Sequence, residues 1–166
     1  MYSVNLSKFT IKGSIEKKVT LGLKDKHQIL ELIMAEYPPH VSFNTVESFD
    51  RYLQNLSNQR HYLLYDYKNH VRGWGVTFNA DDELWFSMVL DHRIQNFGFG
   101  TNLLNFIKEH EPQLSGWVVN FFSDLKFNNN VFRSPLEFYM NQGFVISDET
   151  KFINNFTEVV KIKWCK

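Results

Sequence analysis

The sequence predicts a single α/β domain of the α+β type over residues 1–166, with a mixed central sheet of about six or seven strands and helices on both faces. Two observations lead to this fold class. Three strand-like runs follow one another through short polar turns, which favours an antiparallel meander. A helix and another apolar strand come next, and a strand, helix and strand in such close succession normally make the two strands parallel.

The first elements lie before the meander. Residues 1–15 form a short polar segment that we interpret as an added N-terminal strand. Apolar and polar residues alternate over Lys18–Leu23, as they do in a half-buried strand. Asp25 with Gln28 resembles a cap for the helix that follows, and Pro38–Pro39 ends that helix.

A second helix and the meander follow. Asn44 with Glu47 offers a cap, and apolar residues at steps of three and four predict an amphipathic helix over residues 45–57. Polar turns at 68–70 and 80–82 separate the strands of the meander. These strands are predicted over His61–Tyr67, Val71–Asn79 and Glu83–Leu90.

The last part of the chain completes the sheet. A helix after Gly100 leads into the apolar strand Trp117–Phe122. A short helix is predicted near Pro135–Asn141. The final two strands, Phe144–Ile146 and Thr157–Trp164, are predicted to form a hairpin.

The composition is that of a folded protein and argues against some classes of function. Eighteen basic side chains balance eighteen acidic ones, which disfavours a nucleic-acid or membrane surface recognised through charge. No stretch approaches the roughly 20 apolar residues of a membrane span, and the N-terminus carries no readable export signal. Cys165 is the only cysteine, as suits a reducing compartment. We therefore expect a cytoplasmic protein that binds neither nucleic acid nor a membrane.

Two glycines mark the segment that is most clearly suited to binding a ligand. Gly98 and Gly100 stand where a strand turns into a helix, so the missing Cβ atoms let a ligand approach the backbone amides. Those amides and the positive end of the helix suit a pyrophosphate. A purely steric role for the two glycines is an open alternative.

Two motifs, in this order, resemble those of the GNAT superfamily of acyl-CoA N-acyltransferases. The acyl-CoA loop of that family has Arg or Gln, two residues, Gly, one residue, and then Gly or Ala, and Gln95, Gly98 and Gly100 match it. A second mark, Tyr, three residues and Gly-Phe, is matched by the segment Tyr139–Phe144. The predicted element order is also similar, so the resemblance covers nearly the whole chain beyond residue 15.

The resemblance implies a site for acetyl-CoA as co-substrate. Backbone amides of the loop would hold the pyrophosphate, and the preceding strand end would pair with the amide groups of the pantetheine arm. The family splays this strand from its parallel neighbour to make room, and the neighbour here would be residues 117–122. The implied loop residues are Gln95, Asn96, Phe97, Gly98, Phe99, Gly100 and Thr101, and those of the strand end are Met88, Val89 and Leu90.

The chain departs from the family before the second motif. The family often has Asn seven residues before the tyrosine and Ala four residues before it, whereas this chain has Phe132 and Pro135. Contacts of that loop with pantetheine would then fall to other residues, such as Asn130 or Ser134.

Acetyl transfer to an amine needs an unprotonated nucleophile, stabilisation of charge on the thioester oxygen and a proton for the leaving thiolate. Tyr139 is our candidate for the proton donor, because a phenol with a pKa of about 10 is protonated at neutral pH. The alternative is a half-buried tyrosine that only packs a short helix.

The general base is harder to identify. Glu83, Asp91 and His92 flank the strand expected to line the cleft, and the family often uses a carboxylate there or a chain of waters. Asp91 is the candidate because it is nearest the expected thioester end, although it could instead cap the following turn. Arg93 either reaches a phosphate or lies in a solvated turn. The other histidines show no ligand spacing, so no metal site is expected.

The acceptor would lie, by analogy with the family, against the two N-terminal helices, the loop at 37–40 and the loop after residue 123. Aromatic residues that either line this site or belong to the core are Tyr37, Phe43, Tyr65 and Trp74.

These features favour an enzyme that moves an acetyl group from acetyl-CoA to a primary amine of a small molecule or a protein, without a metal. One alternative is a non-catalytic acyl-CoA-binding sensor or interaction module of the same fold. Another is an aromatic-rich domain that binds nucleic acid or peptide, against which the neutral charge counts. A homodimer is expected if the added N-terminal strand and the last strand, Val159–Trp164, present an open sheet edge.

Overall fold

The computed structural model describes residues 3–6, 9–12, 14–39, 42–121, 133–154 and 157–166. Its strands are β1 (Ser3–Leu6), β2 (Phe9–Lys12), β3 (Ser14–Lys18), β4 (Ser57–Tyr65), β5 (Val71–Ala80), β6 (Glu83–Leu90), β7 (Gln113–Phe121), β8 (Val145–Asn154) and β9 (Thr157–Cys165). Its helices are α1 (Leu23–Glu36), α2 (Val46–Gln54), the 3-10 turn η2 (His92–Ile94), α3 (Phe99–His110) and α4 (Leu136–Asn141).

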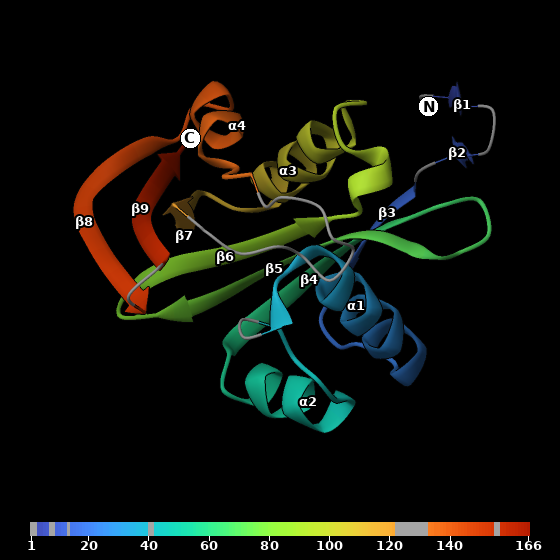
Figure 1. Ribbon diagram of the computed structural model, residues 1–166, viewed down its shortest axis with the longest axis horizontal. Helices are drawn as coiled ribbons and strands as arrows, with labels where there is room; N and C mark the ends of the chain where they lie inside the picture. Colours follow the sequence, from blue (N-terminus) through green and yellow to red (C-terminus); the bar gives the residue numbers. More distant parts are fainter. Residues whose placement is uncertain (1–2, 7–8, 13, 40–41, 122–132, 155–156) are drawn as a thin grey trace.

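Seven strands form one mixed sheet in the order β3-β4-β5-β6-β7-β9-β8, and β6 with β7 is its parallel pair. Figure 1 shows α1 and α2 against one face of this sheet and α3 and α4 against the other. The hairpin β1-β2 forms a separate two-stranded sheet. The predicted fold class, the meander and the final hairpin are therefore confirmed.

Hydrophobic clusters lie on both faces of the sheet because side chains alternate along each strand. In β4, Leu63 packs into the core beneath α1 and α2, whereas Tyr62 packs into the core beneath α3 and α4. In the same way Val89 of β6 faces α1, and Phe86 faces α3. Both faces of β6 are thus fixed by packing.

The start of the sheet differs from the prediction. Residues Lys18–Leu23 do not form a strand, since β3 ends at Lys18 and α1 begins at Leu23. Two of the three apolar residues of the alternating pattern, Val19 and Leu23, are 69% and 66% exposed, and only Leu21 packs against the core, so the alternation does not reflect a buried strand face. Gly22 is the N-cap of α1. Asp25 lies inside the helix and accepts hydrogen bonds from Lys18 and Tyr65 instead of capping it.

The cap of α2 is shifted by one residue from its predicted place. Thr45 is the N-cap, and its side chain accepts a hydrogen bond from the Ser48 backbone amide at 3.1 Å. In return, the Ser48 hydroxyl accepts a hydrogen bond from the Thr45 backbone amide, which completes a capping box. The predicted pair, Asn44 and Glu47, has the same spacing one residue earlier.

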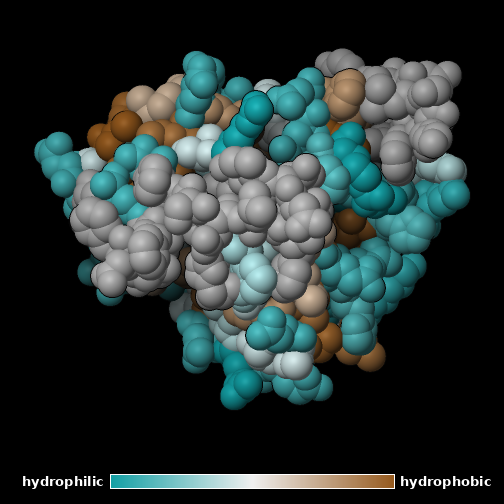
Figure 2. Space-filling view, in the orientation of Figure 1, coloured by the Kyte–Doolittle hydropathy of each residue, from teal (hydrophilic) through white to brown (hydrophobic). Residues whose placement is uncertain are grey.

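The edges of the main sheet are β3 and β8. The last strand, β9, lies between β7 and β8 and is not an edge, so the expected dimer edge at Val159–Trp164 is wrong. Among the described residues, the other end of the main sheet is β3. Figure 2 shows apolar surface at the upper left, over the region of α4 and β8. Exposed apolar residues of that region are Met140, Val145 and Ile146.

None of the helices in the described part of the chain is long and apolar enough to cross a membrane.

Candidate functional site

The parallel strands β6 and β7 are paired over only a short stretch. Among the described residues their register pair is Trp85 with Ser115, near the start of both strands. Beyond it β7 continues against β9 as far as Phe121, while β6 continues against β5 as far as Leu90. The two strands therefore lose their mutual pairing toward their carboxyl ends.

At the end of β6, the backbone N–H and C=O groups of every second residue point toward the gap between these strands. The Asp91 amide donates a hydrogen bond to the Arg72 carbonyl at 2.8 Å, so the backbone groups of Asp91 point toward β5. Every second residue of an antiparallel strand faces the same neighbour, and Val89 therefore also faces β5. Met88 and Leu90 face the other side, toward β7.

Two side chains contact these outward carbonyls. The Gln95 amide Nε2 donates to the Leu90 carbonyl at 2.9 Å. The Tyr37 hydroxyl, at the end of α1, lies 3.5 Å from the Met88 carbonyl, which is a long hydrogen bond. Tyr37 thus reaches the gap from the face of the sheet that carries α1 and α2.

The turn between β6 and α3 presents backbone amides at a helix N-terminus. Asn96 and Gly98 have positive φ angles of 64° and 84°, and Gly98 is the N-cap of α3. The first backbone bond of the helix runs from the Asn102 amide to the Gly98 carbonyl, so the amides of residues 99–101 have no acceptor within the helix. The N-cap, Gly98, has no side chain that could cap them. Such amides, with the positive helix end, suit an anion.

The two glycines of the turn have different requirements. A Cβ at Gly98 meets no atom within 4 Å, so its positive φ rather than crowding requires glycine. A Cβ at Gly100 lies 3.5 Å from Leu90 and Phe138, which is ordinary contact. Of the predicted loop residues, Asn96, Phe97 and Gly98 are exposed, Gln95, Gly100 and Thr101 are half-buried, and Phe99 is buried.

Tyr139 lies in α4 within an aromatic pocket beside β6. Its ring centroid is 5.6 Å from that of Phe86 and 5.4 Å from that of Phe144, and the residue is 5% exposed. Burial raises the pKa of the Tyr139 phenol far above its ordinary value, and the nearby Tyr37 adds to this shift. The two tyrosines come from opposite faces of the sheet and are close enough to interact electrostatically.

Asp91 is held by two arginines. Arg93 donates to it through Nε at 2.9 Å and Nη2 at 2.5 Å, and Arg72 through Nη1 at 3.1 Å. The Asp91 side chain also caps η2 by accepting the Arg93 amide. Burial favours a higher pKa for Asp91, but these hydrogen bonds and charges outweigh it and lower the pKa. The geometry therefore favours the turn cap over the predicted base.

Glu83, at the opposite end of β6, is also ion-paired. Lys163 and Lys161 donate to its carboxylate at 3.0 and 3.1 Å. These hydrogen bonds, that of Lys163 foremost, lower the pKa of Glu83 to about 2. A carboxylate with so low a pKa is a weak proton acceptor at neutral pH.

His92 pairs with a buried glutamate, Glu36, that the sequence motifs did not predict. Glu36 Oε1 accepts the His92 backbone amide at 2.8 Å and lies 2.6 Å from His92 Nδ1. Glu36 is 4% exposed. The signal was present in the sequence, because Glu36 falls three residues after Ile33 and seven after Ile29, on the apolar face of the helix. A carboxylate on such a face requires a partner.

The ligand atoms of Glu36, Asp91 and His92 lie within 4.8 Å of one another, a spacing that a metal ion could use. The two guanidinium groups on Asp91 compete with a cation there. The group adjoins a cavity of about 200 Å³ between α1 and the end of β6. We interpret it as an ion-pair network.

The other predicted residues belong to the core or fall outside the described part. Trp74 and Tyr65 are buried, and Phe43 packs against the same core. Ser134 donates its hydroxyl to the Val119 carbonyl at 2.6 Å and so ties the start of α4 to β7. Asn130 and Phe132, like most of the loop after residue 123, lie outside the described residues.

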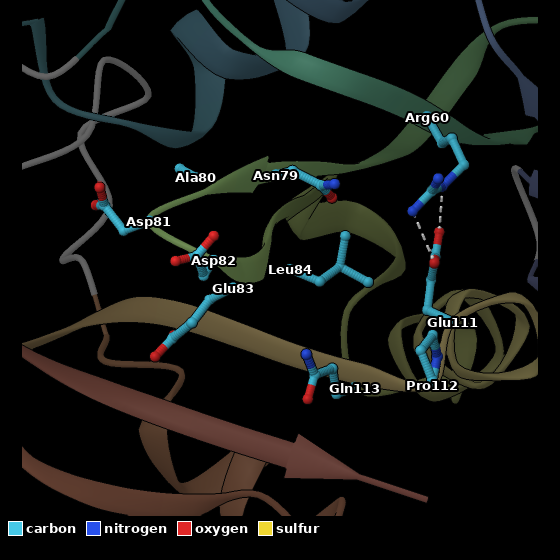
Figure 3. Close-up of a pocket in the computed structure, with 10 residues that line it drawn as sticks. All are labelled: Arg60, Asn79, Ala80, Asp81, Asp82, Glu83, Leu84, Glu111, Pro112 and Gln113. Carbon is cyan, nitrogen blue, oxygen red and sulfur yellow. Dashed lines mark hydrogen bonds and ion pairs between the residues drawn. The ribbon is translucent and has the colours of Figure 1, made fainter.

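A separate hollow of about 550 Å³ lies at the far end of β6. Figure 3 shows Arg60 and Glu111 facing each other at its edge. Glu111 accepts hydrogen bonds from Arg60, Tyr62 and Thr77, so this buried carboxylate is fully engaged. The hollow is at the opposite end of β6 from the turn at Gly98.

Comparisons with known proteins bear on the fold. No family model and no curated protein matches the sequence. A candidate acetyltransferase of the GNAT family from Desulfovibrio desulfuricans has a similar structure, with a TM-score of 0.67 and 12% identity over 92% of this chain and 98% of that one. The chain has the GNAT acyltransferase fold.

Two further GNAT-fold neighbours carry named activities. The ribosomal-protein-S18-alanine N-acetyltransferase of Escherichia coli matches with a TM-score of 0.64 and 12% identity, over 92% of this chain and 93% of that one. The spermidine/spermine N-acetyltransferase SpeG of Vibrio cholerae matches with a TM-score of 0.59 and 15% identity, over 92% of both chains. At these identities the likeness concerns the GNAT fold and leaves the acceptor open.

Proposed function

We propose that the protein is a cytoplasmic N-acetyltransferase that moves an acetyl group from acetyl-CoA to a primary amine of a small molecule or a protein. One observation carries the proposal: the outward backbone of Met88 and Leu90 leads directly to the open helix N-terminus at Gly98. The first feature suits the amides of a pantetheine arm and the second suits a pyrophosphate. The sequence resemblance to the GNAT family implies a co-substrate site at these same two features.

The order of these features gives the direction of the bound molecule. The pyrophosphate lies at residues 98–101, and the pantetheine amides follow along Leu90 and Met88. The thioester then falls toward Phe86, where β6 and β7 come together. Asp91 lies on the pyrophosphate side of this path, which is a second argument against its role as the base.

The transfer itself forms a bond between the amine nitrogen and the thioester carbon and breaks the bond from that carbon to sulfur. The amine loses one proton and the departing thiolate gains one. Tyr139 packs on Phe86, beside the proposed thioester, and its hydroxyl donates a hydrogen bond to the leaving sulfur. Because burial raises the pKa of Tyr139, full loss of its proton is unfavourable, so the phenol takes a proton from solvent water as it gives its own to the leaving sulfur.

The amine is expected to lose its proton to solvent water. Glu83 and Asp91 are ion-paired, and His92 is bound to Glu36. These ion pairs lower the pKa of both carboxylates and so weaken them as proton acceptors. The same observation favours the second candidate function, a non-catalytic acyl-CoA-binding sensor of this fold.

The two functions differ in turnover. We would incubate the protein with acetyl-CoA and a panel of amines and follow the free thiol of released CoA. The panel spans polyamines and peptides with an N-terminal alanine, the acceptor types named for two neighbours, together with amino acids and lysine peptides. Thiol release that depends on the amine supports the enzyme, and acetyl-CoA binding without release on any amine supports the sensor.

A further inference from the structure

The end of α1 contacts β6 and the turn after it through two consecutive residues. Glu36 binds both the backbone amide and the ring of His92, the first residue of η2. Tyr37, the C-cap of α1, places its hydroxyl 3.5 Å from the Met88 carbonyl in the gap. The start of the proposed acyl-CoA turn and the proposed path of pantetheine are thus both linked to one helix end.

Glu36 is an unfavourable choice for packing alone. A buried carboxylate is costly unless it is hydrogen-bonded, and the negative end of a helix dipole disfavours a negative charge. The residue lies on the apolar face of α1 among Ile29, Leu32 and Ile33, where an aliphatic side chain would fill the same space. Packing therefore does not explain a glutamate at this position, whereas its hydrogen bonds to His92 do.

The geometry shows what those bonds fix. The backbone bond to His92 sets the beginning of the chain segment that runs through η2 to Gly98. Because Tyr37 directly follows Glu36, the same bond sets where its hydroxyl stands relative to Met88 and to Tyr139 across the gap. A loose end of α1 would shift both.

We propose that Glu36 is a positioning residue for acyl transfer, which through His92 fixes the proposed acyl-CoA turn and the Tyr37 hydroxyl relative to each other. This inference rests on the proposed function.

Four single variants and one double variant test the inference, each assayed for turnover, acetyl-CoA affinity and melting temperature. Glu36→Ala removes both bonds to His92, and Glu36→Gln keeps an oxygen that accepts the His92 amide. Tyr37→Phe removes only the hydroxyl. Glu31→Ala is the matched control, because Glu31 is an exposed glutamate of the same helix that lines the same cavity.

Glu36→Ala is expected to lower kcat about 10-fold or more, because a small displacement of positioned groups is costly in rate. Glu36→Gln should stay within about threefold of wild type, and Glu31→Ala should match wild type. Tyr37→Phe should also lower kcat, and the double variant Glu36→Ala/Tyr37→Phe should be no slower than the slower single variant, because both act through one hydroxyl. Amide exchange at His92 should be faster in Glu36→Ala than in the wild-type protein.

Three outcomes would overturn the inference. Wild-type kcat in Glu36→Ala or in Tyr37→Phe would overturn it alone, provided that the wild-type protein turns over. Effects of the two single variants that multiply in the double variant would show that Glu36 acts independently of Tyr37. A wild-type protein that neither binds acetyl-CoA nor releases thiol would overturn the proposed function and this inference together. Failure of the inference alone is recognised by a wild-type protein that turns over and variants that match it.

Discussion

The Tyr139 ring lies edge-on to the ring of Phe86, with centroids 5.6 Å apart and planes at 75°. This contact joins α4 to the strand that faces the gap between β6 and β7. It brings the only phenol of α4 to the stretch of β6 where the proposed path of acetyl-CoA ends. The chemistry expected of Tyr139 can be tested apart from its packing.

Tyr139→Phe should lower kcat by ~10²-fold, because the leaving thiolate then loses its hydrogen-bond donor. Acetyl-CoA affinity and melting temperature should change little, since the ring and its contacts with Phe86 and Phe144 remain. Steady-state kinetics with thiol detection would measure kcat, and calorimetry would measure the acetyl-CoA affinity and the melting temperature. Wild-type turnover in this variant would reduce Tyr139 to a packing residue.

Gly98→Val should abolish acetyl-CoA binding while the fold persists. The substitution adds a branched side chain at the N-terminus of α3, beside the amides of residues 99–101, and at a φ of 84° a residue with a Cβ costs roughly 1–2 kcal/mol. Gly22→Val is a matched control, because Gly22 also caps a helix in open space but at a φ of −71°. Equal acetyl-CoA affinity in both variants would remove the anion site from the turn.

Asp91→Asn separates the base from the turn cap. If Asp91 holds Arg93 and Arg72, the variant should be less stable by about 1–3 kcal/mol and should bind acetyl-CoA more weakly, because the chain into the turn loosens. The dependence of kcat on pH should keep its wild-type shape. Loss of an ascending limb in that profile, at unchanged affinity, would instead identify Asp91 as the base.

Glu111→Gln should destabilise the protein by about 3 kcal/mol at neutral pH without altering acetyl-CoA affinity, since it breaks a buried ion pair far from the turn. Burial favours a higher pKa for Glu111, but hydrogen bonds from Tyr62, Arg60 and Thr77 outweigh it and lower the pKa. A lowered pKa stabilises the fold above the unfolded-state value and loses this effect as the pH falls. Denaturant titrations should therefore show the difference between wild type and variant shrinking below about pH 4. A constant difference down to pH 2 would contradict this account.

Much of the fold could be predicted from local patterns. The turn residues around Asn69 and Asp81 have positive φ, as short polar hairpin turns require, and the crossover from β6 through α3 made β6 and β7 parallel. Local patterns failed where tertiary contacts decide. Lys18–Leu23 alternates like a strand, yet Lys18 is held by Asp25 and Tyr65, and the chain turns at once into α1.

The candidate site divides in the same way. Gly98 could be found because a positive φ at a helix start demands glycine, and that demand is local. The partners of Asp91 and His92 could not, because Arg72 and Glu36 are 19 and 56 residues away in the sequence. The position of Asp91 relative to the thioester could not be predicted either, because it depends on which backbone groups of β6 point toward the gap. That direction follows from the register of the strands.

The most direct test of the central claim is a calorimetric titration of the wild-type protein with acetyl-CoA. We expect one site per chain with a dissociation constant in the range of about 1 µM to 1 mM, and its loss in Gly98→Val. The absence of any heat of binding from a folded sample would contradict the assignment of the turn at Gly98 as an acyl-CoA site.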